Sequence, residues 1–264
     1  MLKQYYIPLL LSFLAGLATV IGGFVTFIIK KDDFRALSLG LGFSAGVMIF
    51  LSFTDLLNNA LKLLEPHYPN TYTWLVYVGF IVGVVVAFSI DYFIPDHVDE
   101  SEFTKNKENV SEHRGVKRAG LITAIAIAIH NFPEGLATFF VTTQDVTLGL
   151  TVAIAIGLHN IPEGIAVALP IYNATGKKRT AILYAFLSGI AEPIGAVLGF
   201  CLIHIFLPQM LVGFLLASVA GIMVYISFDT LLPLSHKYGD WHLSIIGVMS
   251  GIVFIWPTLL LINH

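Results

Sequence analysis

The segment HNFPEGLA at residues 130–137 recurs as HNIPEGIA at residues 159–166, so two copies of one polar motif lie 29 residues apart. Each copy puts an imidazole, an amide and a carboxylate inside a stretch that is otherwise apolar. Residues three and four positions apart share a face of an α-helix, so the three polar side chains of each copy project to one side. These residues are His130, Asn131 and Glu134 in the first copy and His159, Asn160 and Glu163 in the second.

A third carboxylate stands in a neighbouring apolar segment, SGIAEPIGAVLG, where Glu192 is followed directly by Pro193. A charge at the centre of a bilayer costs about 2.5–3.5 kcal/mol even on insertion scales. No lysine or arginine of the three apolar segments that hold these glutamates lies at the same depth. Bound cations or protons are therefore the expected counter-charges.

The donor set consists of nitrogen and oxygen only, which suits Zn²⁺, Fe²⁺, Mn²⁺ or Co²⁺ better than soft Cu⁺. Because both motif glutamates lie beside an imidazole and an amide, the pattern predicts two adjacent metal sites that share them. An imidazole-rich site would use His130, Glu134, His159 and Glu163. An oxygen-rich site would use Asn131, Glu134, Asn160, Glu163 and Glu192.

The elements that carry these residues must span a membrane. Of the 264 residues, 56% are hydrophobic and 12% are charged, and the mean hydropathy is +0.83. A soluble domain carries about 25% charged residues, so this composition predicts an integral membrane protein. The single cysteine, Cys201, excludes an intrachain disulfide and a thiolate-rich metal site. No basic patch for nucleic acid is present, so the expected partners are the lipid bilayer and divalent metal ions.

Eight segments are long and apolar enough to cross a bilayer as helices, which predicts an all-α fold in one transmembrane domain over residues 1–264. Both motif glutamates fall near mid-membrane, since Glu134 is about 22 Å and Glu163 about 24 Å from the ends at which their helices begin. The segments lie near residues 5–29, 36–60, 72–94, 119–143, 147–172, 179–206, 209–233 and 242–263.

Twelve of the 14 lysines and arginines fall on one side of the membrane if the N-terminus is placed outside. The positive-inside rule then predicts that both termini are outside and that the polar loop at about 95–118 is cytoplasmic. We expect this loop to be a solvated connector. The short inner loop LPLSHKYGDWH holds His236 and His242, which could receive metal or be solvated loop residues.

A second repeat supports an inverted arrangement. The sequences GVMIFLSFTDLL at 46–57 and GIMVYISFDTLL at 221–232 share six of twelve positions and lie in helices of opposite direction. This predicts that the first three helices and the last three are inverted copies around the central pair, as in many transporters. Asp55 would lie near an outer helix end and Asp229 near an inner end, either as interfacial carboxylates or as metal attractors at each mouth.

Three classes of function are compatible with a buried metal site. The first is a divalent metal importer, which the inverted repeats favour. The second is a membrane-embedded metalloenzyme, but the sequence has no H-E-x-x-H or G-x-S-x-G motif. The third is a metal sensor, which the lack of a sizeable soluble domain disfavours. We therefore expect a transporter rather than an enzyme, with no resident cofactor, and the sequence leaves a monomer and a homodimer both open.

Four segments of the sequence resemble those of a known transporter family. The segments HNFPEG, HNIPEG, VALPIYNATGKKRTAI and SGIAEPIGAVLG resemble those of the ZIP (Zrt-, Irt-like) divalent metal transporters, especially the bacterial ZupT branch. The resemblance implies eight helices, a two-metal site and import into the cytosol across the inner cell membrane. It implies ligand roles for Asn131, Glu134, His159, Asn160, Glu163 and Glu192. His130 joins this set through its place on the same helix face.

Overall fold

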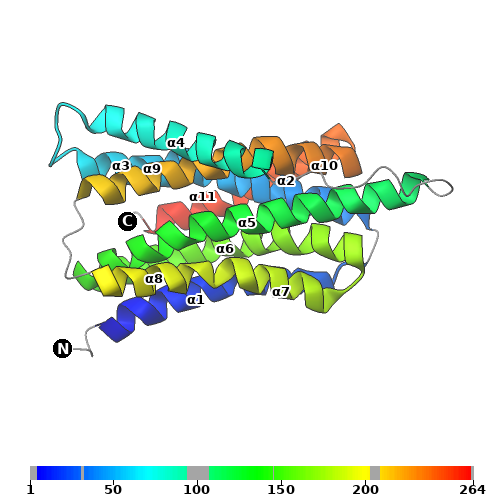
Figure 1. Cartoon of the computed structure of the whole chain (residues 1–264), viewed down its shortest axis with the longest axis horizontal. Coiled ribbons are helices and arrows are strands. Elements are labelled where there is room, and N and C mark those ends of the chain that lie inside the picture. The colour runs from blue at the N-terminus through cyan, green and yellow to red at the C-terminus, as the bar shows by residue number, and fades with distance from the viewer. Residues whose placement is uncertain (1–4, 31–32, 94–106, 145, 203–208, 263–264) are drawn as a thin grey trace.

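The computed structural model describes residues 5–30, 33–93, 107–144, 146–202 and 209–262. Within these ranges the chain is a bundle of long helices without strands (Figure 1). Seven stretches are long and apolar enough to cross a membrane: Tyr6–Phe27, Phe34–Leu64, Tyr72–Tyr92, Gly120–Thr143, Val152–Thr175, Lys178–Cys201 and Met210–Tyr238. A shorter apolar stretch, Trp241–Pro257, lies in the last helix, where the eighth segment is expected.

The helices are α1 (Tyr6–Gly23), α2 (Phe34–Leu51), α3 (Leu57–Leu64), α4 (Tyr72–Phe93), α5 (Lys107–Gln144), α6 (Val146–Thr175), α7 (Lys178–Gly189), α8 (Ala191–Leu202), α9 (Gln209–Ile226), α10 (Leu232–Tyr238) and α11 (Trp241–Ile262). A 3₁₀ turn, η2 (Phe24–Phe27), extends α1. Two π-helical turns, η3 (Ser52–Leu56) and η5 (Ser227–Leu231), join α2 to α3 and α9 to α10.

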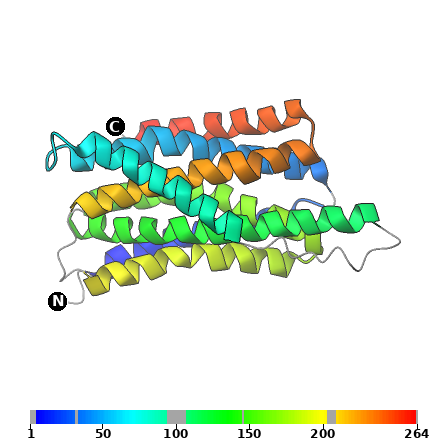
Figure 2. The ribbon, with the colours of Figure 1, turned by 45° about the horizontal axis from the view of Figure 1, so that its top comes forward.

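The elements pack as two groups. In the first, α1 packs against α6, α7 and α8, and α5 packs against α6 and α8. In the second, α2 packs against α10 and α11, and α9 packs against α3 and α4. The groups meet where α2 contacts α6 and where α5 contacts α9. Figures 1 and 2 show α1 beginning and α11 ending toward the same end of the bundle, as the prediction for the two termini requires.

The prediction for the loop at about 95–118 is wrong over its second half, because α5 already begins at Lys107. Residues 94–106 lie outside the described residues. The charged stretch 107–118 contains good helix formers such as Lys, Glu and Arg, so its composition allows the helix to begin before the apolar segment. The segment predicted at 179–206 is divided at Ile190 into α7 and α8. Pro193 has no N–H to donate to the Gly189 carbonyl, which weakens the helix at this point.

Proline does not break the two motif helices. Pro133 lies inside α5 and Pro162 lies inside α6, and each helix continues for more than a turn on both sides. Each proline removes one backbone donor, which is tolerated in a membrane helix that is buried among neighbours. The α6 span is indeed 65% buried over its most apolar window, against 22% for the peripheral α4 span.

The glycine of each motif copy allows close helix packing. A Cβ atom on Gly135 would overlap the carbonyl oxygen of Glu192 in α8, and one on Gly164 would overlap the carbonyl oxygen of Thr19 in α1. Small residues let membrane helices approach to backbone contact. These two contacts fix α5 against α8 and α6 against α1, which sets the positions of the polar side chains nearby.

We predict that Gly164→Ala destabilises the protein by about 1–3 kcal/mol, the usual cost of overpacking. Gly157→Ala is the matched control in the same helix, because its Cβ would lie 3.8 Å from the nearest atom, the Cα of Ala15. The thermal unfolding of the two detergent-purified variants measures the difference. Equal melting temperatures would contradict the close α1–α6 contact.

Candidate metal site

All seven predicted site residues are brought together at the centre of the first helix group. α5 supplies His130, Asn131 and Glu134, α6 supplies His159, Asn160 and Glu163, and α8 supplies Glu192 in its first turn. Each is at most 3% exposed. The cluster therefore lies out of contact with bulk water, where unpaired polar groups are costly.

The two motif copies pair across the α5–α6 interface. The Nε2 atom of His130 lies 2.9 Å from Oε1 of Glu163, and the two groups are hydrogen-bonded. The reciprocal pair is looser, with His159 Nε2 lying 3.5 Å from Oε2 of Glu134 and neither atom making a hydrogen bond. Because α5 and α6 run in opposite directions, each histidine faces the glutamate of the other copy rather than its own.

The two asparagines connect the cluster to the surrounding helices. Asn160 Nδ2 donates to the Ala15 carbonyl of α1 at 2.9 Å and to Glu192 Oε2 at 2.8 Å. Asn131 Nδ2 donates to the Ser188 carbonyl of α7 at 3.2 Å. Both amide groups use their N–H donors in this way, and the Oδ1 atom of each has no hydrogen-bond partner.

Nine buried atoms of the seven residues lack a hydrogen-bond partner. They are His130 Nδ1, Asn131 Oδ1, Glu134 Oε1 and Oε2, His159 Nδ1 and Nε2, Asn160 Oδ1, Glu163 Oε2 and Glu192 Oε1. Most buried polar atoms in folded proteins are hydrogen-bonded, so such a concentration needs a specific cause. Seven of the nine are oxygen or Nε2 atoms of the kind that bind divalent metals.

No group of three or more His, Cys, Asp and Glu side chains in the described part of the chain is arranged to hold a metal ion as it stands. The imidazoles and carboxylates instead contact one another in pairs. A metal ion can replace each His–Glu contact, because the same Nε2 and carboxylate oxygen atoms would then bind the ion. Such binding would require the histidine and glutamate side chains to rotate, but it would not require any residue from outside the cluster.

Asp55 lies closer to the cluster than its sequence position suggests. We expect it near the outer end of a helix, but the membrane-spanning stretch continues to Leu64, nine residues further along. Asp55 stands in the π-helical turn η3 and lies within electrostatic range of His159 and Glu134. A π-helical turn rotates the residues around it, and the sequence pattern of a regular helix does not reveal this change.

The remaining candidates lie apart from the cluster. His236 and His242 are exposed at the end of α10 and the start of α11, and the ring of His236 packs edge-on against Trp241. In the second group, the Tyr225 hydroxyl contacts the carboxylates of Asp229 and Asp91. Asp229 thus has side-chain contacts in η5, the π-helical turn that matches η3, where it aligns with Thr54, the residue before Asp55.

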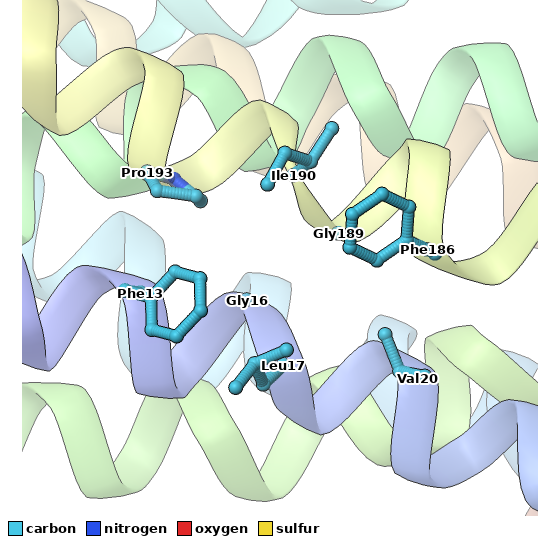
Figure 3. A pocket seen from close by; sticks show the side chains of 8 residues that line it. All are labelled: Phe13, Gly16, Leu17, Val20, Phe186, Gly189, Ile190 and Pro193. Carbon is cyan, nitrogen blue, oxygen red and sulfur yellow. The ribbon is translucent and has the colours of Figure 1, made fainter.

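An apolar pocket lies between α1 and α7–α8 (Figure 3). It has no charged or polar side chain along its walls, so it is unsuited to the passage of an ion. Its lining includes Phe13, Leu17, Val20, Phe186, Ile190 and Pro193.

Comparison with known proteins decides the family. The family described as "ZIP Zinc transporter" matches residues 94–256. The chain belongs to this ZIP family. It is 45% identical to the zinc transporter ZupT of Akkermansia muciniphila over 93% of this chain and 94% of that protein. It is 46% identical to ZupT of Chlorobium phaeovibrioides, over 99% of this chain and the whole of that protein. It is 44% identical to ZupT of Campylobacter jejuni, over 99% of this chain and 98% of that protein. A ZIP protein is a transporter rather than an enzyme, as expected from the sequence.

We predict that His130 and Glu163 stabilise each other more strongly than His159 and Glu134 do. The first pair is hydrogen-bonded and fully buried, whereas the second is 3.5 Å apart without a hydrogen bond. A double-mutant cycle of His130→Ala and Glu163→Ala, with unfolding measured in the presence of a metal chelator, should give a coupling energy of about 1 kcal/mol or more. The matching cycle of His159→Ala and Glu134→Ala should give a smaller value, and equal coupling would contradict the asymmetry.

Proposed function

We propose that this protein transports divalent metal ions, zinc among them, through the cluster formed by α5, α6 and α8. The observation that carries the proposal is the group of nine buried nitrogen and oxygen atoms without hydrogen-bond partners. Divalent ions would bind these atoms and offset the three carboxylate charges. Full-length similarity to proteins named zinc transporters supports zinc as one of the ions carried.

The cluster supports two adjacent metal sites with shared glutamates. His130, Glu134, His159 and Glu163 form the two imidazole–carboxylate pairs, which favour Zn²⁺. The Glu192 carboxylate, which contacts Asn160, and the unpartnered Oδ1 atoms of both asparagines form an oxygen-rich set. Such oxygen donors also accept Fe²⁺, Mn²⁺ and Co²⁺, so we include these ions in the proposal.

The charge distribution supports an orientation of the chain in the membrane, and the resemblance to ZIP transporters supports import. Placing the twelve clustered lysines and arginines in the cytoplasm puts both termini outside the inner cell membrane. Asp55 would then lie between the outer surface and the cluster, in electrostatic range of Glu134 and His159. We propose that its carboxylate attracts incoming cations, that the ions move into the cytosol, and that residues 1–264 act as a single transmembrane domain.

We predict that Glu134→Ala and Glu163→Ala each reduce zinc uptake into proteoliposomes to background, since each removes a charge from both proposed sites. Glu65→Ala is the control, because Glu65 is an exposed glutamate just beyond the end of α3. It should keep the wild-type rate. Wild-type uptake in both motif variants at equal protein levels would contradict the shared-ligand arrangement.

We predict that His159→Ala and Asn160→Ala change metal preference in opposite directions. Loss of an imidazole should lower zinc uptake more than manganese uptake, and loss of an amide oxygen should do the reverse. Competition between Zn²⁺ and Mn²⁺ in the same proteoliposomes measures this preference. Equal losses for both metals in both variants would show that the two sites do not act separately.

A further inference from the structure

Two of the buried threonine hydroxyls on α5 lack the hydrogen bond that hydroxyls within a helix usually make. Hydroxyl groups within helices commonly donate to the carbonyl oxygen four residues earlier. Ser52, Thr142 and Ser227 do so at 2.6–2.7 Å. The hydroxyls of Thr123 and Thr138, and that of Thr19 in α1, have no hydrogen-bond partner although each residue is at most 1% exposed.

Thr138 shares the helix face of the metal cluster. At about 100° per residue it lies about 40° around α5 from Glu134 and one turn, about 6 Å, further along the axis. The contacts of α5 with α8, through Gly135 at Glu192 and Phe139 at Gly199, lie about 60° and about 100° around the helix from Thr138, on the side away from Glu134. Thr138 therefore extends the line of His130 and Glu134, whereas Thr142 is turned further away and is already bonded to the Thr138 carbonyl at 2.6 Å.

Thr138 also lies on the same side of the cluster as Asp55. α3, which follows Asp55, and the C-terminal end of α5, which follows Thr138, lie toward the same end of the bundle (Figure 1). Asp55 is in electrostatic range of Glu134 and His159. Thr123 lies on the other side, seven residues before His130, with the apolar Ile127 between them on the same face. Of the unpartnered hydroxyls on α5, that of Thr138 is therefore the one that lies one turn beyond Glu134, toward the end of the bundle where α3 lies.

We propose that the hydroxyl oxygen of Thr138 is a transient metal ligand between Asp55 and the Glu134–His159 pair. A divalent ion that leaves water must exchange its hydration shell for protein oxygens step by step. A neutral hydroxyl can replace one water without adding charge, so the ion binds but is not trapped before it reaches the glutamates. This inference rests on the proposed transport function and names a specificity-determining residue for it.

If Thr138 only filled space between helices, removing its hydroxyl group while keeping its shape would not change transport. Thr138→Val keeps the shape of the side chain and removes only the hydroxyl, and Thr138→Ser keeps the hydroxyl. Thr142→Val is the matched control, since Thr142 is an equally buried threonine of the same helix whose hydroxyl is occupied by its own backbone. A role in packing alone predicts that Thr138→Val transports as well as Thr142→Val does.

The first experiment measures Zn²⁺ uptake by the full chain in proteoliposomes as a function of zinc concentration. Thr138→Val should raise the KM about fivefold to tenfold, the usual effect of one lost polar contact. Thr138→Ser and Thr142→Val should remain near the wild-type KM. Unchanged KM in Thr138→Val would overturn the inference, and absence of uptake by the wild-type protein would overturn the proposed function itself.

The second experiment tests direct contact with the ion through metal preference. Thr138→Cys places a soft sulfur where the hydroxyl stands, so the ratio of Cd²⁺ to Zn²⁺ uptake should rise above that of the wild type. Thr142→Cys should leave the ratio unchanged. An unchanged ratio in Thr138→Cys would overturn the inference even if Thr138→Val fails to fold.

Discussion

The structure depends on one constraint, the burial of three carboxylates in a membrane-spanning bundle where, among the residues that the structure describes, no lysine or arginine forms a salt bridge with them. Glu134 and Glu163 each face the imidazole of the other motif copy, and Glu192 accepts a hydrogen bond from Asn160. These contacts offset only part of the cost of burial, because Glu134, Glu163 and Glu192 all retain oxygen atoms without a partner. A bound divalent cation would offset the remaining cost of burying the carboxylates. The oxygen atoms that lack a hydrogen-bond partner are therefore also the atoms available to bind a metal ion.

Close packing by the motif glycines holds this cluster in place. Gly135 brings α5 against the backbone of Glu192 itself, so the same contact that joins α5 to α8 also positions the third carboxylate. Gly164 brings α6 against Thr19 of α1, close to the Ala15 carbonyl that accepts from Asn160. The second group of helices reaches the motif through Ser44, whose hydroxyl donates to the Pro162 carbonyl at 2.6 Å. Within each motif copy, the glycine packs against a neighbouring helix, and the histidine, asparagine and glutamate beside it supply the polar atoms of the cluster.

The two π-helical turns give the inverted repeat a structural counterpart. Ser52–Leu56 and Ser227–Leu231 are each five residues long and occupy matching positions in the two similar segments. Asp55 and Asp229 each lie nine residues before the end of their membrane-spanning stretch, at Leu64 and Tyr238. Their surroundings differ, since Asp55 is in electrostatic range of the metal cluster whereas Asp229 contacts Tyr225. The two matching π-helical turns therefore carry carboxylates with different neighbours, at positions that differ by one residue in the aligned repeat.

The sequence by itself determined the membrane-spanning elements and the residues of the cluster. Apolar length fixes the spans, and the repeated spacing of histidine, asparagine and glutamate fixes the shared helix face, because both follow from local helix geometry. The tertiary structure decided that His130 pairs with Glu163 rather than with Glu134, four residues away on its own helix. It also decided that Asp55 approaches the cluster, that α5 begins at Lys107 and that the Thr138 hydroxyl is left without a partner. These features depend on how helices are rotated and packed against one another, and that rotation comes from contacts between residues far apart in the chain, which no local pattern records.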